Sequence, residues 1–130
     1  MELYKIKIKS SGDGWTDNRT SIGKYYDDGV MRFKYEIDGD VCVLSVKDGV
    51  VTQTRKGDNE FAFVFERGKT TKCVFGSEGM RGEYAIHTDK LKIYRGDGVF
   101  RLTLGYCLGD GEEKIKLIFT AVKNITQEMK

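Results

Sequence analysis

The sequence predicts an all-β fold, in which an antiparallel meander of about ten strands closes into a β-barrel. Three observations support this fold class. Short runs of β-branched and aromatic residues recur along the chain, separated by a glycine beside a charged residue. The chain has 16 glycines and no proline, and proline would break the ladders of paired strands. No segment shows sustained helical periodicity. Since no linker interrupts this pattern, we expect a single β-barrel domain over residues 1–130.

Asp-Gly and related pairs mark the expected turns, because both residues tolerate the positive φ that two-residue hairpin loops require. Each turn fixes the register of its two strands, and the register decides which face a side chain occupies. The expected turns and loops lie at residues 28–29, 38–39, 48–49, 56–60, 67–69, 78–79, 88–89, 96–97 and 110–111.

The turns carry one apolar face from strand to strand. Counted from 38–39 and 48–49, Tyr35 faces Cys42, and Cys42 faces Arg55. The flanking turns, counted in the same way, pair Phe61 with Phe75, Tyr26 with Met31, Ile86 with Leu91, Ile93 with Phe100 and Tyr106 with Ile115.

The front of the sheet needs one adjustment. The turn at 28–29 places Ile22 and Lys24 on the apolar face, and we expect a bulge to turn Lys24 outward. With that change, one face collects most of the large apolar side chains and the other most of the charged ones. A sheet of about ten strands with one dry face usually closes or splits, and we expect closure into a barrel.

Composition limits the partners and the compartment. The residues are 39% hydrophobic and 32% charged, which is typical of a globular, water-soluble chain. The net charge of +2 is too even to favour nucleic acid on electrostatics alone. The start of the chain, MELYKIKIK, has no apolar run long enough for a signal peptide or a membrane span. We therefore expect a cytoplasmic protein with no membrane partner; the sequence leaves the oligomeric state open.

Lysines alternate with apolar residues near the start, at Lys5, Lys7 and Lys9. Such a stripe is usually a solvated face that also protects a sheet edge. The alternative is a face that contacts phosphate groups.

The cysteines and the histidine do not form a metal set. Cys42, Cys73 and Cys107 form no CxxC pair, and His87 is the single histidine of the chain. We expect free thiols in a reducing compartment, no metal site and no cofactor.

The chain contains six short runs in a definite order and spacing: Gly23–Tyr26, Tyr35–Glu36, Arg55–Gly57, Phe65–Lys69, Tyr84–Thr88 and Leu104–Tyr106. Over residues 20–125 they resemble the YwiB-like bacterial family, a domain of unknown function. Two positions depart from the pattern. Met80 stands where a glycine would open the eighth strand, and Glu112-Glu113-Lys114 where an asparagine would open the last.

The resemblance implies a calycin-like, or lipocalin-like, β-barrel. It implies no activity, because none is established for the family, so no catalytic residue is carried over. Relatives of this barrel type often bind small molecules inside, but a fold does not fix a function.

Arg55 is the most informative single residue, because the register points it inward beside Cys42 and Tyr35, and the inward residues counted above include no carboxylate. An unpaired buried guanidinium would be costly. Its head can reach the barrel mouth and stack on Tyr35, pair with a misplaced carboxylate such as Glu36 or Asp58, or bind an anionic ligand group.

The segment from Ser10 to Thr20 joins the first two expected strands and carries the single tryptophan, Trp15. As a long loop it could fold over the mouth as a lid; the alternative is a surface loop with Trp15 held against the barrel wall. We place any ligand site at this end rather than at the Met31 end, which tight turns close. The candidate ligand-binding residues are Arg55, Tyr35, Trp15, Phe61, Phe75 and Cys42.

Nothing in the sequence predicts catalysis. His87 falls on the outer face, the inward residues include no pair of carboxylates, and GDG never precedes a helical segment. Beside Arg55, the Cys42 thiol could have a lowered pKa and support a thiol-dependent activity, but a buried cysteine is usually inert.

We therefore expect no enzyme and no catalytic residues. The first hypothesis is a barrel that binds a small, partly apolar, anionic molecule at its mouth. The alternative is a protein- or nucleic-acid-interaction module that uses the outer basic face and has a filled interior.

Overall fold

The computed structural model describes residues 2–77, 80–109 and 111–123. Consecutive strands in this part of the chain are joined by short connections. The strands are β1 (Glu2–Gly12), β2 (Trp15–Asp27), β3 (Met31–Ile37), β4 (Asp40–Lys47), β5 (Val50–Lys56), β6 (Asn59–Glu66), β7 (Thr70–Ser77), β8 (Met80–Gly96), β9 (Val99–Leu108) and β10 (Ile115–Lys123).

The strands form a closed antiparallel barrel in the order β1-β10-β9-β8-β7-β6-β5-β4-β3-β2. Each strand pairs with the next one along the chain, and β1 closes the barrel by pairing with β10 from Tyr4↔Lys123 to Ser11↔Lys116. The predicted meander barrel is therefore confirmed. No helix in the described part of the chain is long and apolar enough to cross a membrane.

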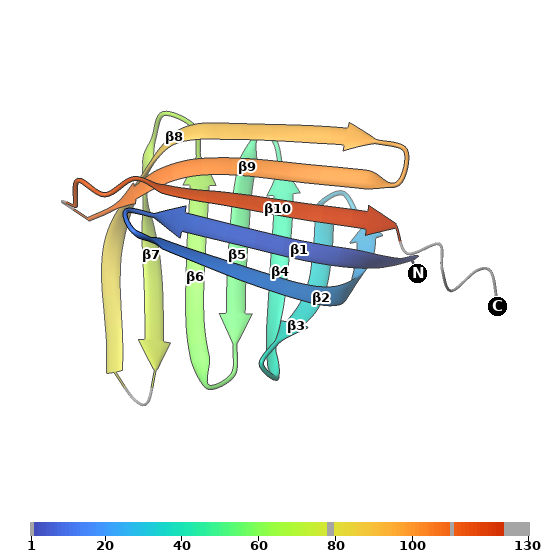
Figure 1. Cartoon of the computed structure of the whole chain (residues 1–130), viewed down its shortest axis with the longest axis horizontal. Helices are drawn as coiled ribbons and strands as arrows, with labels where there is room; N and C mark the ends of the chain where they lie inside the picture. The colour runs from blue at the N-terminus through green and yellow to red at the C-terminus, as the bar shows by residue number, and fades with distance from the viewer. Residues whose placement is uncertain (1, 78–79, 110, 124–130) are drawn as a thin grey trace.

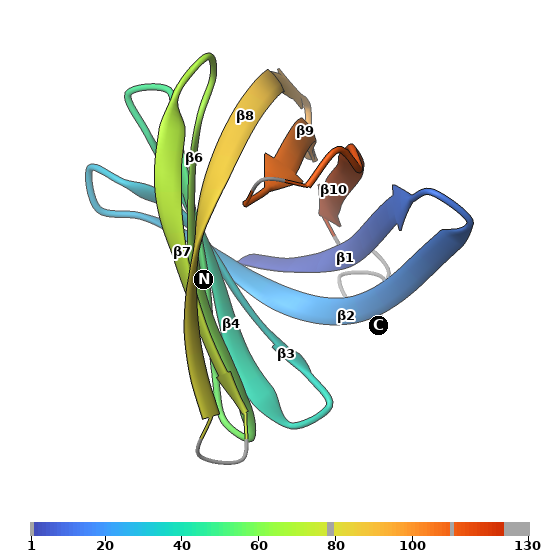
Figure 2. The same ribbon diagram turned by 90° about the vertical axis from the view of Figure 1, so that its left-hand side faces the viewer.

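The barrel consists of two sheets whose strands run in crossed directions (Figures 1 and 2). We call β3–β7 with the first half of β8 the first sheet, and the second half of β8 with β9, β10, β1 and β2 the second sheet. β8 belongs to both, since Met80–His87 pair with β7 and Ile86–Gly96 pair with β9.

The turn predicted at 88–89 is wrong, because β8 continues through these residues without reversing its direction. A register shift between Thr88 and Lys90 marks a β-bulge, which bends the strand from one sheet into the other. The backbone of buried Thr88 is bonded to the β6–β7 turn, with Gly68 N donating to Thr88 O at 2.7 Å and Thr88 N donating to Lys69 O at 3.2 Å. The predicted Ile86–Leu91 pair is accordingly absent: Ile86 faces Leu108.

The central registers are confirmed. Tyr35 pairs with Cys42, and Cys42 pairs with Arg55. Asp38 and Asp48 both have φ of 51°, and each is followed by a glycine of positive φ, as a type I′ turn requires. Phe61↔Phe75 and Tyr106↔Ile115 are confirmed as well. The predicted turn at 78–79 and residue 110 lie outside the described residues.

The register at the front is wrong by one residue. The β2–β3 loop has three residues, so that Tyr25 pairs with Phe33 and Tyr26 with Arg32 rather than with Met31. In this loop Gly29 has a positive φ of 98°, and its N–H donates to Asp27 Oδ1 at 3.0 Å. Lys24 and Ile22 consequently point outward, with no bulge needed.

The turn predicted at 96–97 is also displaced by one residue. Gly96 pairs with Val99, so that Asp97-Gly98 forms the turn and Ile93 faces Leu102 instead of Phe100. The run Gly96-Asp97-Gly98 offers two overlapping turn pairs, and Gly98 has the positive φ of 67°.

The predicted loop at 10–20 is a hairpin. β1 and β2 continue to Gly12↔Trp15, and Asp13-Gly14 makes the turn. Its strands were not recognised because their tips are polar on both faces, with serines, threonines and aspartates. The lid hypothesis is therefore wrong.

The core fills the barrel at the Met31 end. Phe33 and Phe119 are almost fully buried and lie 5.5 Å apart, and Phe100 lies 5.1 Å from Phe33. Full burial of one such side chain contributes about 1.5–3 kcal/mol.

Candidate functional site

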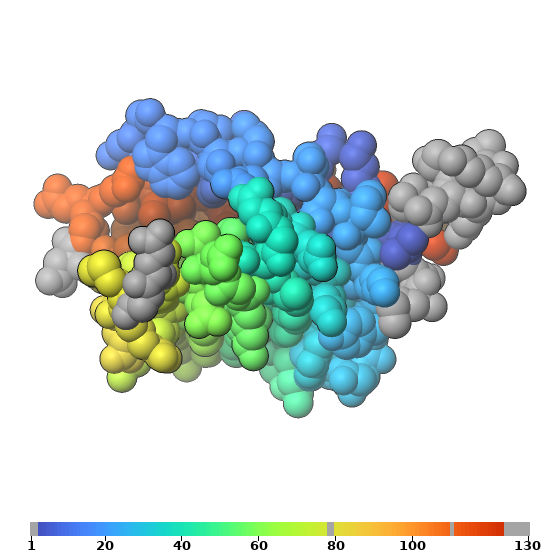
Figure 3. Space-filling model, turned by 90° about the horizontal axis from the view of Figure 1, so that it is seen from below, coloured from blue at the N-terminus to red at the C-terminus, as the bar shows by residue number. Residues whose placement is uncertain are grey.

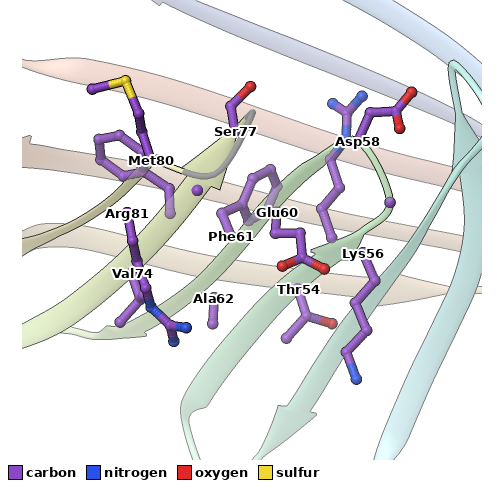
Figure 4. Close-up of a pocket in the computed structure, with 14 residues that line it drawn as sticks. Thr54, Lys56, Asp58, Glu60, Phe61, Ala62, Val74, Ser77, Met80 and Arg81 are labelled. Carbon is purple, nitrogen blue, oxygen red and sulfur yellow. The ribbon is translucent and has the colours of Figure 1, made fainter.

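A pocket of about 720 Å³ lies at the Arg55 end, where β5, β6, β7 and β8 begin or end. Because side chains alternate along a strand, its lining comes from both faces of the first sheet. Figure 4 shows Phe61 and Met80 on one side of these strands and Ala62 and Val74 on the other. The pocket thus spans the rim of the barrel. Seen from below, the molecule is hollowed between β6–β8 and the β1–β2 hairpin with β10 (Figure 3).

Inward-facing aromatic residues meet solvent on the inner side of this rim. Phe75 lines the pocket and is 40% exposed; it stacks on Tyr84, which is 47% exposed, with ring centroids 4.9 Å apart and planes at 4°. Phe61 stacks on Phe63 at 4.7 Å. Met80, on the same face, is 78% exposed. The inner face is therefore more open here than at the Met31 end, where Met31 and Phe33 are buried.

Gly82 makes room for the stacked rings of Phe75 and Tyr84. It pairs with Phe75, and a Cβ at this position would lie 3.2 Å from Tyr84 Cε2 and 3.8 Å from Phe75 Cζ. The absence of a side chain lets both rings lie flat against the strand.

Arg55 is held by a carboxylate that the sequence analysis did not place inward. Its Nε donates to Asp40 Oδ2 at 2.7 Å, and the two side chains are 15% and 5% exposed. Arg55 Nη2 also donates to Ile37 O at 3.4 Å. The hypothesis that Arg55 pairs with a carboxylate is right in kind, but the partner is Asp40 rather than Glu36 or Asp58.

Asp40 connects β4 to the β5–β6 turn. It accepts the backbone N–H groups of Asp58, at 2.9 Å, and Asn59, at 3.3 Å. The hydrogen bond from Arg55 is the largest cause that lowers the pKa of Asp40, and the two backbone donors lower it further. Gly57 has no room for a side chain, since a Cβ would lie 2.6 Å from Asp40 Cγ.

The sequence did contain a signal for Asp40. It stands two residues before Cys42 on the same strand, so it shares the inward face of Cys42. It was overlooked because it directly follows the Asp38-Gly39 turn.

Tyr35 and Cys42 lie in the core and are not among the residues that line the pocket. Gln53 Nε2 donates to the Tyr35 hydroxyl at 3.3 Å, and burial raises the pKa of Tyr35. Burial also raises the pKa of the Cys42 thiol, which the charge of Arg55 only partly opposes. The expectation of a lowered Cys42 pKa therefore finds no support.

Trp15 is also away from the pocket lining. Its indole Nε1 donates to Glu113 Oε2 at 2.8 Å, and the same oxygen accepts Asp13 N at 2.8 Å. The tryptophan is thus tied to the segment before β10, which resembles the alternative of a tryptophan held against the wall. Figure 2 shows this hairpin tip on the far side of the opening from β6 and β7.

A second ion pair crosses the rim between the two sheets. Arg19, on the inward face of β2, bonds to Asp38 Oδ2 at 2.6 Å and to Asp17 Oδ2 at 3.2 Å. The Ser21 hydroxyl donates to Glu36 O at 2.8 Å beside it. This contact was not predicted, because residues 10–20 were expected to form a loop.

The opposite end holds a pocket of about 120 Å³, lined by Tyr25, Met31, Arg95 and neighbouring residues. Within the part of the chain that the structure describes, no three histidine, cysteine or acidic side chains are placed to hold a metal ion.

These features define a class: a closed antiparallel β-barrel with an aromatic core and, at one end, an open pocket lined by both aromatic and charged side chains. The chain belongs to the family described as Domain of unknown function (DUF1934), whose model matches residues 4–118. The crystal structure of the ywiB protein from Bacillus subtilis is similar, with a TM-score of 0.78 over 94% of this chain and 90% of that chain. The family resemblance is thereby confirmed. At 17% identity, the structural likeness concerns the fold alone. No curated protein matches the sequence.

Proposed function

We propose that the protein binds a small, partly apolar molecule with an acidic group in the pocket at the Arg55 end, and that it binds this molecule without catalysis. The observation that supports the proposal is the exposure of inward-facing aromatic side chains. Phe75 and Tyr84 are 40% and 47% exposed although they face the barrel interior. Binding sites are typically concave and combine apolar side chains with placed polar groups; this pocket combines Phe61, Phe75 and Met80 with charged residues such as Arg55 and Arg81.

The apolar part of the ligand lies against Phe61 and Phe75, which line the pocket, and reaches Tyr84, which stacks on Phe75. A flat ring that stacks on an aromatic side chain gains about 0.5–1.5 kcal/mol beyond the burial of its area. The stacked pair of Phe75 and Tyr84 presents such a surface without rearrangement.

The acidic group lies near Arg55. A guanidinium has five N–H groups, and in the described structure Arg55 uses one toward Asp40 and one toward Ile37. The others can donate to a ligand oxygen. Because Asp40 neutralises the charge of Arg55, this contact orients the ligand more than it attracts it, and the aromatic contacts contribute more of the affinity.

The remaining candidates from the sequence are left out of the proposed contact set. Tyr35 and Cys42 are buried in the core, and Trp15 is bonded to Glu113.

Fluorescence of 1-anilinonaphthalene-8-sulfonate tests the proposal, since this probe joins flat aromatic rings to an anionic group. We expect saturable binding to the native protein. Phe75→Ala and Tyr84→Ala should each weaken it by about tenfold, which corresponds to about 1.4 kcal/mol.

Tyr94→Ala is the matched control, because Tyr94 is 60% exposed on the outer face of the second sheet. Its affinity should stay unchanged. Equal loss in all three variants, or no saturable binding to the native protein, would rule out the site. If the site binds the probe as expected, native mass spectrometry of protein purified from its own host would identify a retained ligand.

A further inference from the structure

The outer face of the second sheet carries a concentration of positive charge. Its strands lie side by side in Figure 1. The side chains concerned are all exposed, and we call them the basic face: Lys5, Lys7, Lys9, Lys24, Lys90, Lys92, Arg101 and Lys116.

The register orders most of these cations into two lines. Lys5, Lys7 and Lys9 alternate with inward residues along β1, so neighbours are about 6.7 Å apart. Across the sheet, Lys7 pairs with Thr120, and Thr120 pairs with Arg101. Lys92 lies on β8, one strand beyond Arg101. The first line is thus the lysines of β1, and the second line is the cations of β9 and β8. The two lines are two to three strand spacings apart, about 10–14 Å.

Within the described strands, the acidic residue on this face is Asp89, at the bulge of β8, where a Cβ on Gly105 would lie 2.9 Å from its Oδ1. The other outward positions of this face hold serine, threonine, asparagine, glycine, cysteine, tyrosine or aliphatic residues. None of the eight cations takes part in an ion pair among the described residues. Asp89 itself is paired with a lysine outside this set, since its Oδ2 lies 3.1 Å from Lys114 Nζ.

Other acidic residues of the chain lie away from this face. Described strands carry them on the outer face of the first sheet, at Glu36, Glu60, Glu66 and Glu83, where lysines and arginines accompany them. Most of the others stand in turns. The net charge of +2 therefore hides a separation of charge between the two sheets.

Such a face fits a polyanion. Protein surfaces usually intersperse both signs of charge, because like charges without counter-charges repel one another. Threonine and asparagine side chains lie between the cations, at Asn18, Thr20, Thr103 and Thr120, and such groups donate to phosphate and sugar oxygens. The exposed apolar residues Ile22 and Val122 stand on either side of Lys5, and Tyr94 pairs with Arg101, so they are single residues among the cations rather than one apolar patch.

We propose that the basic face binds the phosphate backbones of a nucleic-acid duplex. The separation of its two lines matches the width of a duplex groove, which is about 12 Å for the major groove of DNA. The contact is to the backbone and carries no base sequence. It uses the opposite side of the second sheet from the pocket interior, and it does not depend on the proposed ligand.

Fluorescence anisotropy with a labelled DNA duplex tests this proposal. Lys5, Lys7 and Lys9 are replaced together by glutamine, a change of exposed side chains that leaves Tyr4, Ile6 and Ile8 in place. We expect binding by the native protein at about 50 mM salt, and a decrease in affinity of at least about tenfold in the triple variant. The dependence of affinity on salt should also flatten, by about 0.9 in the logarithmic slope for each phosphate group that the variant no longer neutralises.

The matched control replaces Lys47, Lys56 and Lys72 by glutamine. These exposed lysines lie on the outer face of the first sheet, and the net charge falls by the same amount. This variant should bind the duplex within about twofold of the native protein, well below one logarithmic unit.

Three outcomes would overturn the proposal: no duplex binding at low salt, an equal decrease in affinity in both triple variants, or tighter binding to the single strand or to anionic phospholipid vesicles than to the duplex. An RNA duplex of the same sequence distinguishes the two kinds of duplex. Phe75→Ala should leave duplex binding unchanged, so failure of this proposal and failure of the pocket proposal are distinguishable.

Discussion

Arg55 Nε lies 2.7 Å from Asp40 Oδ2, so the inward cation of the barrel rim has its own carboxylate. The pair joins the start of β4 to the end of β5, and Asp40 also binds the backbone of the β5–β6 turn. A residue that sequence reasoning regarded as an anion-binding candidate is therefore first a structural one. Asp40, which is nearly buried, orients the remaining N–H groups of Arg55.

The first prediction concerns the pH dependence of this pair. Asp40→Asn should destabilise the protein at neutral pH, because Arg55 loses its charged partner. The pKa of Asp40 is lowered in the fold, so its contribution is present above the ordinary value of about 3.9 and is lost as the pH falls through the lower folded value. Urea unfolding between neutral and acid pH should show the difference from the native protein shrinking below about pH 4.

Asp48→Asn is the control for that series. Asp48 stands in an exposed turn with φ of 51°, a conformation that asparagine adopts readily. A difference for Asp40→Asn that stays constant down to the acid range would contradict the assigned role.

The second prediction concerns the buried hydrogen bond between Gln53 and Tyr35. Tyr35→Phe leaves the Gln53 amide without its partner, and Gln53→Leu leaves the hydroxyl without its donor. Each should cost about 1–3 kcal/mol of unfolding free energy. The double variant should cost clearly less than the sum, because both polar groups are gone. Strict additivity in urea unfolding would show that the two groups do not interact.

The third prediction concerns Gly23, where β2 passes closely over β3. A Cβ there would lie 2.9 Å from Lys34 O and 3.1 Å from Tyr35 Cβ, and it would also meet Ile6. Gly23→Ala should destabilise the barrel by about 1–3 kcal/mol through overpacking. Thr20→Ala, an exposed change on the same strand, should have little effect on the urea midpoint. Equal urea midpoints for both variants would mean that β2 and β3 can move apart at little cost in free energy.

The fourth prediction concerns the three free cysteines. Burial raises the pKa of Cys42 and Cys73, whereas Cys107 is partly exposed. In the native protein a disulfide reagent such as Ellman's should modify Cys107 first, and the other two only on unfolding. Mass mapping of the labelled peptides identifies the site. Rapid labelling of Cys42 at neutral pH would instead revive a thiol-dependent activity.

The sequence predicts registers well where a turn has one reading. At Asp38-Gly39 and Asp48-Gly49 both residues adopt positive φ, and every pairing counted from them is correct. It fails where two turns overlap, as at Gly96-Asp97-Gly98, or where polar strand tips hide a hairpin, as around Asp13-Gly14. At Thr88 the chain bends without turning, because backbone bonds to a neighbouring turn hold the bulge.

The site was predictable in part. Register placed Phe61, Phe75 and Arg55 inward at one end, and the structure brings these three to one pocket. The exposure of Phe75 and Tyr84 was not predictable. It depends on where the two crossed sheets separate, and alternation along a strand carries no information about that.

The pairing of β1 with β10 has a consequence for how the chain folds. The two strands stand at opposite ends of the sequence, yet their register runs from Tyr4↔Lys123 to Ser11↔Lys116. During synthesis β1 has its partner β2 early, but its other edge stays unpaired until β10 leaves the ribosome. Closure over such a long loop is slow, and an open sheet edge is prone to join other chains. The lysines of β1 then serve the nascent chain, because charged side chains along an unpaired edge discourage aggregation before the barrel is complete.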